Sequence, residues 1–153
     1  VGTTAGGLPI YKYNNSITTN SSGVWSADPI EWDTYTLGYS PNTYDLVERC
    51  PNTVSVLADS NTSATITLAP NTNNSLRVMV GSSGVDVNGA QVLVEGGVVN
   101  EVADTRTCGQ IYFGDLPAST YTVTVSKPGF QTEIVSGLSV SGDTDVSIVL
   151  TSL

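Results

Sequence analysis

The sequence predicts an all-β protein of two tandem β-sandwich domains, and three observations support this. The 153 residues are rich in Thr, Ser, Val, Asn and Gly, which are β-branched or turn-forming types, while helix-forming residues are scarce. Short apolar segments alternate with polar residues at a period of two, and Gly, Asn or Asp turns separate them. The order of these segments in the first half recurs in the second half.

Six segments of the second half have the residue types and spacing of β-strands. They are residues 76–80, 90–94, 109–113, 121–126, 134–140 and 146–150. Residues 121–126 alternate Tyr, Val and Val with Thr, Thr and Ser, so this strand is expected to bury one face. Six or seven short strands separated by turns are typical of a small sandwich.

The first half repeats this plan in a looser form. Residues 8–13, 18–25, 33–37 and 64–68 take the places of residues 90–94, 104–112, 119–123 and 145–150. We therefore expect one domain at residues 1–70 and another at residues 75–153. The polar linker N-T-N-N at residues 71–74 joins them, and so short a linker often leaves two domains in end-to-end contact.

The two halves differ at their start. The second half opens with the apolar strand at residues 76–80, whereas Val1 corresponds to the last residue of an equivalent strand. The first domain is thus expected to lack its opening strand, which leaves an unpaired sheet edge. Two explanations stay open: an N-terminal segment has been removed, or a neighbouring subunit donates the strand.

Motifs of the second half resemble those of a known family of β-sandwich domains. Residues 107–123, T-C-G-Q-I-Y-F-G-D-L-P-A-S-T-Y-T-V, are similar to the pattern T-D-x-x-G-x-Y-x-F-x-x-L-P-x-G-x-Y-x-V of carboxypeptidase regulatory-like, or transthyretin-like, domains. Residues 127–130, K-P-G-F, match the family's x-x-G-Y/F. Residues 85–92, V-D-V-N-G-A-Q-V, resemble its opening G-x-P-V-x-G-A-x-V, with Asp86 in place of the usual proline.

A looser copy of these motifs lies in the first half, at residues 19–25 and 30–37. Asp33 replaces the usual glycine there, which looks similar to tandem domains on the outer parts of bacterial pilin-like surface proteins. The resemblance implies two seven-stranded transthyretin-like (Ig-like) sandwiches that act as spacers, stalks or attachment modules. It implies no catalytic residues, and fold alone does not set function.

The charge of the chain argues against several partners. Five Lys and Arg and fourteen Asp and Glu give a net charge of −9, which opposes binding to nucleic acid and to anionic membrane surfaces. The sequence contains no apolar run of about 18 residues, so no membrane insertion is expected of this segment. A surface rich in Thr, Ser and Asn resembles those of exported proteins, so we expect a secreted, extracellular protein at the cell surface.

The sequence offers little catalytic chemistry. It contains no histidine, which excludes Ser-His-Asp and Cys-His arrangements and the imidazole ligands of most catalytic zinc sites. Asp28, Glu31 and Asp33 lie on a turn and strand start, where solvated carboxylates are expected rather than a glycosidase pair. Neither they nor Asp143 with Asp145 follow a calcium-loop pattern. We therefore expect no enzymatic activity, no metal and no cofactor.

Cys50 and Cys108 are the two cysteines of the chain, one in each half. In an oxidising compartment two cysteines usually pair. Closing a loop of about 58 residues would stabilise the folded state by about 4 kcal/mol in the chain-entropy model. We predict an interdomain disulfide rather than two free thiols.

The first half is also rich in aromatic residues, which can stack against sugars. Strand parity assigns Tyr35 and Tyr121 to the core, and Trp25 matches core positions of the second half. The remaining candidates for a ligand-binding surface are Tyr11, Tyr13, Tyr39 and Trp32.

Four Asn-x-Ser/Thr sequons are candidate glycosylation sites, although a chain with this much Asn, Ser and Thr produces several by chance. They are Asn14, Asn20, Asn61 and Asn73. The second falls in the turn N-S-S-G at residues 20–23.

The sequence favours a non-enzymatic structural subunit or headpiece of an extracellular, pilin-like filament or surface assembly. Its expected partners are copies of itself or other subunits of the assembly. The alternative, from a different class, is a carbohydrate-binding or adhesion module that binds glycans through the aromatic side chains of the first domain.

Overall fold

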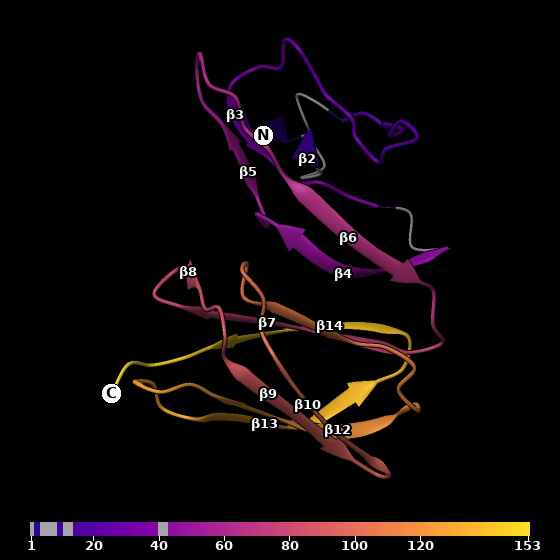
Figure 1. Ribbon diagram of the computed structural model, residues 1–153, viewed down its shortest axis with the longest axis vertical. Helices are drawn as coiled ribbons and strands as arrows, with labels where there is room; N and C mark the ends of the chain where they lie inside the picture. Colours follow the sequence, from indigo (N-terminus) through magenta and orange to yellow (C-terminus); the bar gives the residue numbers. More distant parts are fainter. Residues whose placement is uncertain (1, 4–8, 11–13, 40–42) are drawn as a thin grey trace. The chain divides into compact units, whose positions relative to one another are not determined.

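The computed structural model describes residues 2–3, 9–10, 14–39 and 43–153 (Figure 1). In these ranges the chain forms strands, turns and loops, and no helix is long and apolar enough to cross a membrane. The all-β fold expected from the sequence is thus confirmed. The chain divides into two compact units, Val1–Glu31 and Trp32–Leu153. The domain boundary expected at residues 71–74 stays a prediction.

The first unit contains one short antiparallel pair, β1 (Gly2–Thr3) with β2 (Pro9–Ile10). It also contains the turn expected at residues 20–23. The Asn20 side-chain oxygen accepts hydrogen bonds from the backbone N–H groups of Ser22 and Val24, at 2.9 and 3.0 Å. Gly23 has a φ of 74°, which glycine adopts without steric cost.

The second unit contains a two-layered β-sandwich. Its strands are β7 (Ser75–Ser82), β8 (Val85–Asp86), β9 (Gln91–Gly96), β10 (Val99–Asp104), β11 (Gln110–Phe113), β12 (Ser119–Ser126), β13 (Glu133–Val140) and β14 (Asp143–Val149). One sheet has the order β10-β9-β12-β13 and the other β11-β7-β14, with β8 added to β7 (Figure 1). The β14–β7 pair is parallel, and the other pairs are antiparallel.

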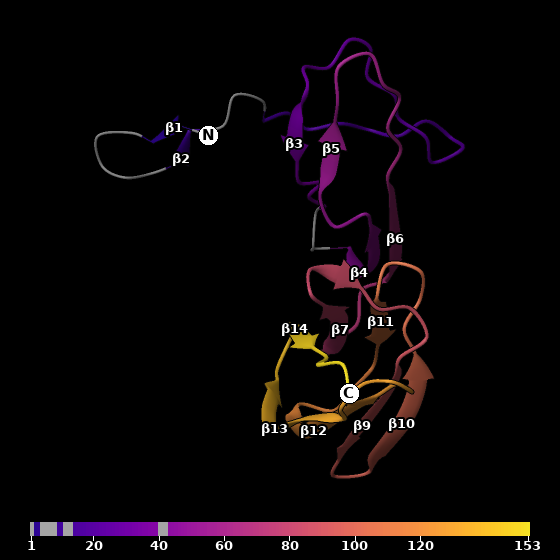
Figure 2. The ribbon, with the colours of Figure 1, turned by 90° about the vertical axis from the view of Figure 1, so that its left-hand side faces the viewer.

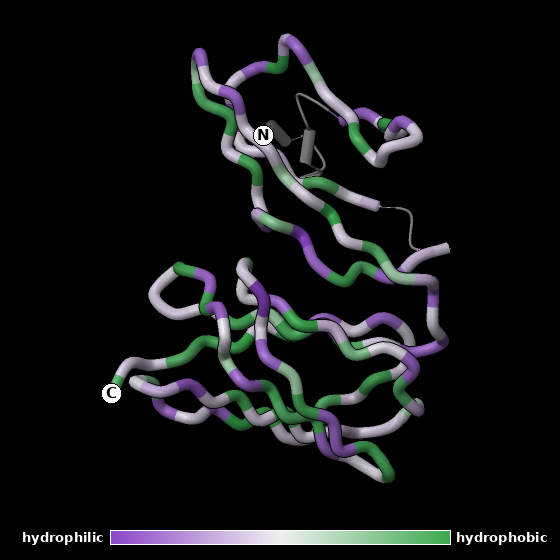
Figure 3. The backbone as a smooth tube through the Cα atoms, viewed as in Figure 1, coloured by the Kyte–Doolittle hydropathy of each residue, from purple (hydrophilic) through white to green (hydrophobic). Residues whose placement is uncertain are grey.

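The core of this sandwich follows from the alternation of its strands. In β12, Tyr121, Val123 and Val125 are buried, while the residues between them are half-buried. The same cluster also contains Leu76, Val78, Val80, Val92, Val94, Phe113, Val140, Ile148 and Leu150. Each fully buried side chain of this size stabilises the fold by about 1.5–3 kcal/mol. Apolar positions recur along these strands in Figure 3.

The rest of the second unit forms two short sheets. β3 (Asp33–Tyr35) pairs with β5 (Val54–Val56), and β4 (Tyr44–Cys50) pairs with β6 (Thr65–Pro70), both antiparallel. β4 contacts β11 and β7 of the sandwich (Figure 2). Ser75 and Arg77 of β7 alternate with the core residues, yet both are buried. Their face of β7 therefore also lies against protein, which explains why β7 is buried on both sides.

All six strands expected in the second half are present. The sequence pattern does not predict β8 and β10, and β10 carries Asn, Glu and Asp because it is an edge strand that pairs only with β9. In the first half, the segments at 33–37 and 64–68 correspond to β3 and β6. The pattern does not predict β4 and β5. Residues 8–13 lie mostly outside the described residues, and the seven-stranded sandwich expected there stays a prediction.

Candidate functional site

Most buried polar side chains of the second unit gather where β4 meets β7 and β11, a contact that we call the junction. Asp45, Arg77 and Gln110 are all buried there, together with Ser75 at the start of β7. Buried polar groups are costly unless they are hydrogen-bonded, so their partners decide whether the junction stabilises the fold.

A disulfide closes one end of the junction. Cys50, the last residue of β4, is bonded to Cys108 in the turn before β11, with 5.5 Å between their Cα atoms. This is the pairing that the sequence favoured. The next residue, Gly109, has a φ of 65°, and a Cβ atom there would overlap the Val80 carbonyl oxygen. Glycine is therefore required for the turn that presents Cys108.

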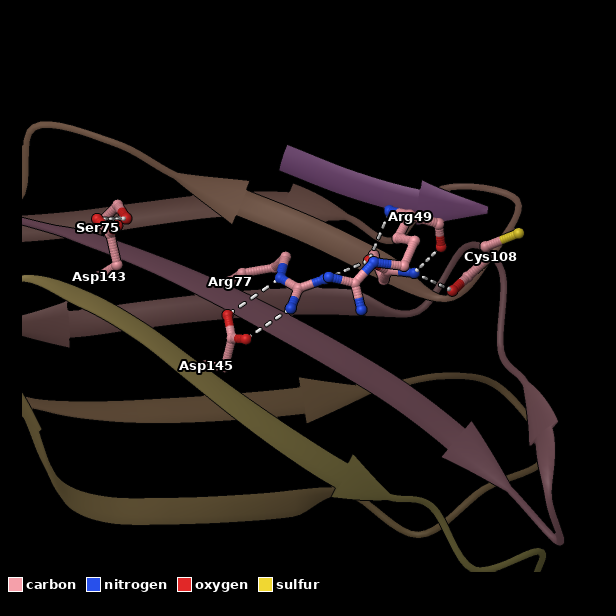
Figure 4. Close-up of polar contacts among 7 residues, drawn as sticks. Arg49, Ser75, Arg77, Cys108, Asp143 and Asp145 are labelled. Carbon is pink, nitrogen blue, oxygen red and sulfur yellow. Dashed lines mark hydrogen bonds and ion pairs between the residues drawn. The ribbon is translucent and has the colours of Figure 1, made fainter. Parts of the chain in front are cut away.

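Gln110 attaches the backbone of β4 to the sandwich. Its side-chain oxygen accepts hydrogen bonds from the Arg49 backbone N–H at 3.1 Å and from Arg77 Nη1 at 2.9 Å. Its side-chain nitrogen donates to the carbonyl oxygens of Arg49, at 2.6 Å, and Cys108, at 3.3 Å. One buried amide thus satisfies both backbone groups of Arg49, as a neighbouring strand would (Figure 4).

Arg77 carries the charge of the junction. Its Nε and Nη2 atoms donate to the two carboxylate oxygens of Asp145, at 3.0 and 2.5 Å, in the bidentate geometry typical of strong ion pairs (Figure 4). The parallel register of β14 and β7 places these two residues side by side. Burial, and then the charge of Arg77, lower the pKa of Arg49.

Asp45 forms a second polar cluster farther along β4. Its carboxylate accepts hydrogen bonds from Asn71 Nδ2 at 2.9 Å, from the Thr72 backbone N–H at 3.1 Å, from Thr72 Oγ1 at 2.7 Å and from Tyr112 Oη at 2.6 Å. Burial opposes the ionisation of Asp45, but hydrogen bonds from Tyr112 and Thr72 outweigh it and lower its pKa. Burial and the bond to Asp45 raise the pKa of Tyr112 to about 12. The proton therefore stays on the phenol.

The segment expected as a linker is held to the sandwich. Asn74 Nδ2 donates to the Leu116 carbonyl oxygen at 3.0 Å, and its Oδ1 accepts from the Gly142 backbone N–H at 2.8 Å. Ser75 Oγ donates to Asp143 Oδ1 at 3.1 Å (Figure 4). With Asn71 and Thr72 bound to Asp45, residues 71–75 are fixed by side-chain hydrogen bonds along most of their length.

The structure describes two of the four residues expected to bind a ligand, and the surface expected of them stays a prediction. Tyr11 and Tyr13 lie outside the described residues. Trp32 is 74% exposed. Tyr39 is half-buried, and burial followed by the charges of Asp143 and Asp145 raises its pKa. Trp25, expected in the core, is 38% exposed.

The four sequons are accessible. Asn14, Asn20, Asn61 and Asn73 are all exposed. Their exposure is compatible with glycosylation, which stays a prediction.

One group among the described residues has the ligand types and spacing of a metal site. A carboxylate oxygen of Glu48 and the sulfur atoms of Cys50 and Cys108 lie within 4.8 Å of one another. The two sulfur atoms are bonded to each other, so only the carboxylate is available while the disulfide is intact. These three residues therefore do not provide a set of metal ligands while the disulfide is intact.

Sequence reasoning missed the polar residues of the junction. Asp45, Arg77 and Gln110 lie on strands where an outward-facing polar side chain is ordinarily solvated. One signal was the position of Gln110, two residues after Cys108, because an interdomain disulfide requires the segments around it to approach each other.

The fold and the junction define the class of the protein, a β-sandwich domain bonded covalently to a further β region. The chain belongs to the carboxypeptidase regulatory-like domain family, whose model matches residues 75–151, half of the chain. The resemblance seen in the second half is thus confirmed. A comparison with curated proteins found no match.

Solved structures show partial similarity. An N-terminal interface mutant of a type II cohesin–X–dockerin complex from Acetivibrio cellulolyticus is 22% identical, with a TM-score of 0.44, over 51% of this chain and 57% of that chain. The C-terminal interface mutant of the same complex is also 22% identical, with a TM-score of 0.45, over 51% of this chain and 57% of that chain. The Bacillus anthracis TIE protein is 14% identical, with a TM-score of 0.44, over 72% of this chain and 24% of that chain.

Proposed function

We propose that the chain is a non-enzymatic structural subunit or headpiece of an extracellular, pilin-like filament or surface assembly. Its partners are copies of itself or other subunits of the assembly. The observation that carries this proposal is the junction, where a disulfide and two buried hydrogen-bond clusters hold β4 against the sandwich. A subunit of this kind needs a defined relation between its ends, and it needs no catalytic group.

The chemistry of the junction supports an extracellular site of action. Disulfides persist in oxidising compartments and are reduced in the cytosol. Gln110 beside the disulfide and Asp45 farther along β4 use their buried polar atoms in hydrogen bonds between β4 and β11. Family membership fits this role, because the matched residues 75–151 form the whole sandwich.

Electron microscopy of the native, undissociated material tests the proposal directly. Filaments or other ordered assemblies that contain this chain are the expected result. Sedimentation velocity over a wide concentration range provides the second measurement, in which the sedimentation coefficient should rise with concentration. A protein that stays monomeric at every concentration, alone and with the other subunits of its surface, would contradict the proposal.

A second candidate function is carbohydrate binding, and it is favoured by the exposure of Trp32. Exposed aromatic rings can stack on sugar faces, and a large tryptophan that is 74% exposed contributes little to the fold. A glycan array with the native chain and with Trp32→Ala tests this candidate. Binding that the substitution abolishes would support it, whereas an array without any bound glycan would exclude it.

A further inference from the structure

The hairpin that joins β9 to β10 ends in an apolar side chain. Val99 pairs with Gly96, so the tip has two residues, Gly97 and Val98. Gly97 has a φ of 59°, the conformation that the first central residue of such a turn requires. Nothing in this turn requires a valine, yet Val98 is 94% exposed and is the most exposed large hydrophobic residue in the described part of the chain.

A hollow of about 400 Å³ lies beside β8, at the start of the loop that leads to β9. Its apolar lining comes from Val85, Val87 and Phe130, and its polar lining includes Lys127 and Asp86. The Lys127 ammonium donates a hydrogen bond to the carbonyl oxygen of Asn88, another lining residue, at 2.5 Å. Val85 is itself exposed, so apolar surface faces solvent here too.

The hairpin tip and the hollow lie at opposite ends of the same sandwich. β9 runs from Gln91, just after the loop that lines the hollow, to Gly96 at the tip, a distance of roughly 17 Å for six residues in a strand. Figure 1 shows β8 and the tip of the β9–β10 hairpin at opposite sides of the sandwich, and Figure 3 shows apolar residues at both places.

The charges around the two features are partly complementary. Glu95 and Glu101 flank the hairpin tip and are exposed, whereas Lys127 lies in the hollow as one of only five basic residues of the chain. Asp86 lines the same hollow and opposes this attraction. In a contact between the two features, apolar burial would supply most of the attraction, and pairing of Lys127 with the glutamates would set the orientation.

We propose that the Val98 tip of one copy inserts into the hollow of the next copy, so that the sandwiches join head to tail. This inference rests on the proposed function, because it names the contact between subunits. The two surfaces differ, so an assembly of any length keeps one free tip at one end and one free hollow at the other. A contact of this kind produces an open filament unless the rotation between successive copies closes a ring.

A matched pair of substitutions tests the contact in the full chain. Val98→Asp should weaken self-association at least tenfold in sedimentation velocity, because it places a charge in the apolar hollow. Val102→Asp is the control, since Val102 is an exposed valine of the same hairpin away from its tip. Unchanged assembly in Val98→Asp, or equal weakening in both variants, would overturn the inference.

A cysteine pair identifies the geometry independently. In the double variant Val85→Cys with Val98→Cys, mild oxidation should give a ladder of covalent oligomers, because the two thiols of one chain are too far apart to pair. Either single variant should stay unlinked, because its cysteine faces a valine of the next copy. A double variant that gives no ladder would rule out the head-to-tail contact.

Charge reversal checks the role of Lys127. Lys127→Glu should weaken assembly, and the further changes Glu95→Lys and Glu101→Lys in the same chain should restore it.

The unmodified protein distinguishes the failure of this inference from the failure of the proposed function. The absence of any assembly in the unmodified protein would contradict both. Assembly that survives Val98→Asp would contradict only the head-to-tail contact.

Discussion

The two β regions of the second unit differ in how they are stabilised. The sandwich at residues 75–150 has its own apolar cluster, which includes Leu76, Tyr121 and Val123. In the described part of the chain before residue 75, the buried hydrophobic residues are Leu46 and Val54. The earlier region therefore depends on the junction, where Asp45 and Cys50 bond to the sandwich. One sequence thus contains a domain that stabilises itself and a region that is stabilised by attachment.

The largest expected effect comes from removing the disulfide. The double substitution Cys50→Ser with Cys108→Ser should lower the free energy of unfolding by about 4 kcal/mol, because it frees a loop that spans 58 residues. Urea unfolding measures the loss, and limited proteolysis should cut first before residue 75. Added reductant should destabilise the unmodified chain and leave the variant unchanged. Equal stability of the two proteins would show that the earlier region does not depend on this bond.

A core substitution should affect the sandwich itself. Leu76→Ala should lower the free energy of unfolding by about 3 kcal/mol, because it leaves a cavity among fully buried side chains. Leu57→Ala is the matched control, since Leu57 is exposed, and its effect should stay within about 0.5 kcal/mol. If both substitutions lowered the free energy of unfolding equally, the sandwich would not be more dependent on its apolar core than the earlier region is.

Asp45→Asn tests the polar part of the junction at almost constant shape. The substitution should lower the free energy of unfolding by about 2 kcal/mol, because the amide cannot accept all the hydrogen bonds of the buried carboxylate. The pKa of Asp45 is lowered in the folded state, so its contribution is present above its unfolded pKa of about 4 and is lost as the pH falls through the folded pKa. The deficit of the variant should therefore shrink in acid. Asp59→Asn, in an exposed turn, is the control, and its effect on the free energy of unfolding at neutral pH should stay within about 0.5 kcal/mol.

The smallest effect is confined to alkaline solution. The pKa of Tyr112 is raised to about 12, above the ordinary value of about 10. Because the folded state holds this proton more tightly, the stability contributed by Tyr112 is present below pH 10 or so and is lost as the pH rises toward 12. Ultraviolet titration of tyrosinate should show late-titrating phenols, and one of them should be missing in Tyr112→Phe. If Tyr112→Phe leaves the number of late-titrating phenols unchanged, the late titration belongs to other tyrosines.

Alternating apolar residues made the sandwich predictable. Residues such as Tyr121, Val123 and Val125 face a core on one side only, so the period of two is visible in the sequence. The edge strand β10 has a weaker pattern and was not predicted. β4 was not predicted either, because it lies against protein through Asp45, Arg49 and Gln110 rather than through an apolar stripe.

The candidate site was predictable only in its covalent part. Two cysteines in one chain favour a disulfide, and Cys50 and Cys108 are paired. The partners of Gln110 and Arg77 depend on which strands meet in space, and no local pattern encodes that. A buried polar side chain has the same sequence signature as a solvated one until the neighbouring strand is known.

The disulfide also sets how far the chain can lengthen under tension. A force applied to β4 passes through Cys50 and Cys108 directly into β11, so the covalent path omits the strands β5 to β10 between them. Fully extended, a span of 58 residues would add roughly 200 Å of contour length. While the disulfide is intact, these residues cannot add to the length of the chain. A subunit under tension can then lengthen only by unfolding the segments before Cys50 and after Cys108.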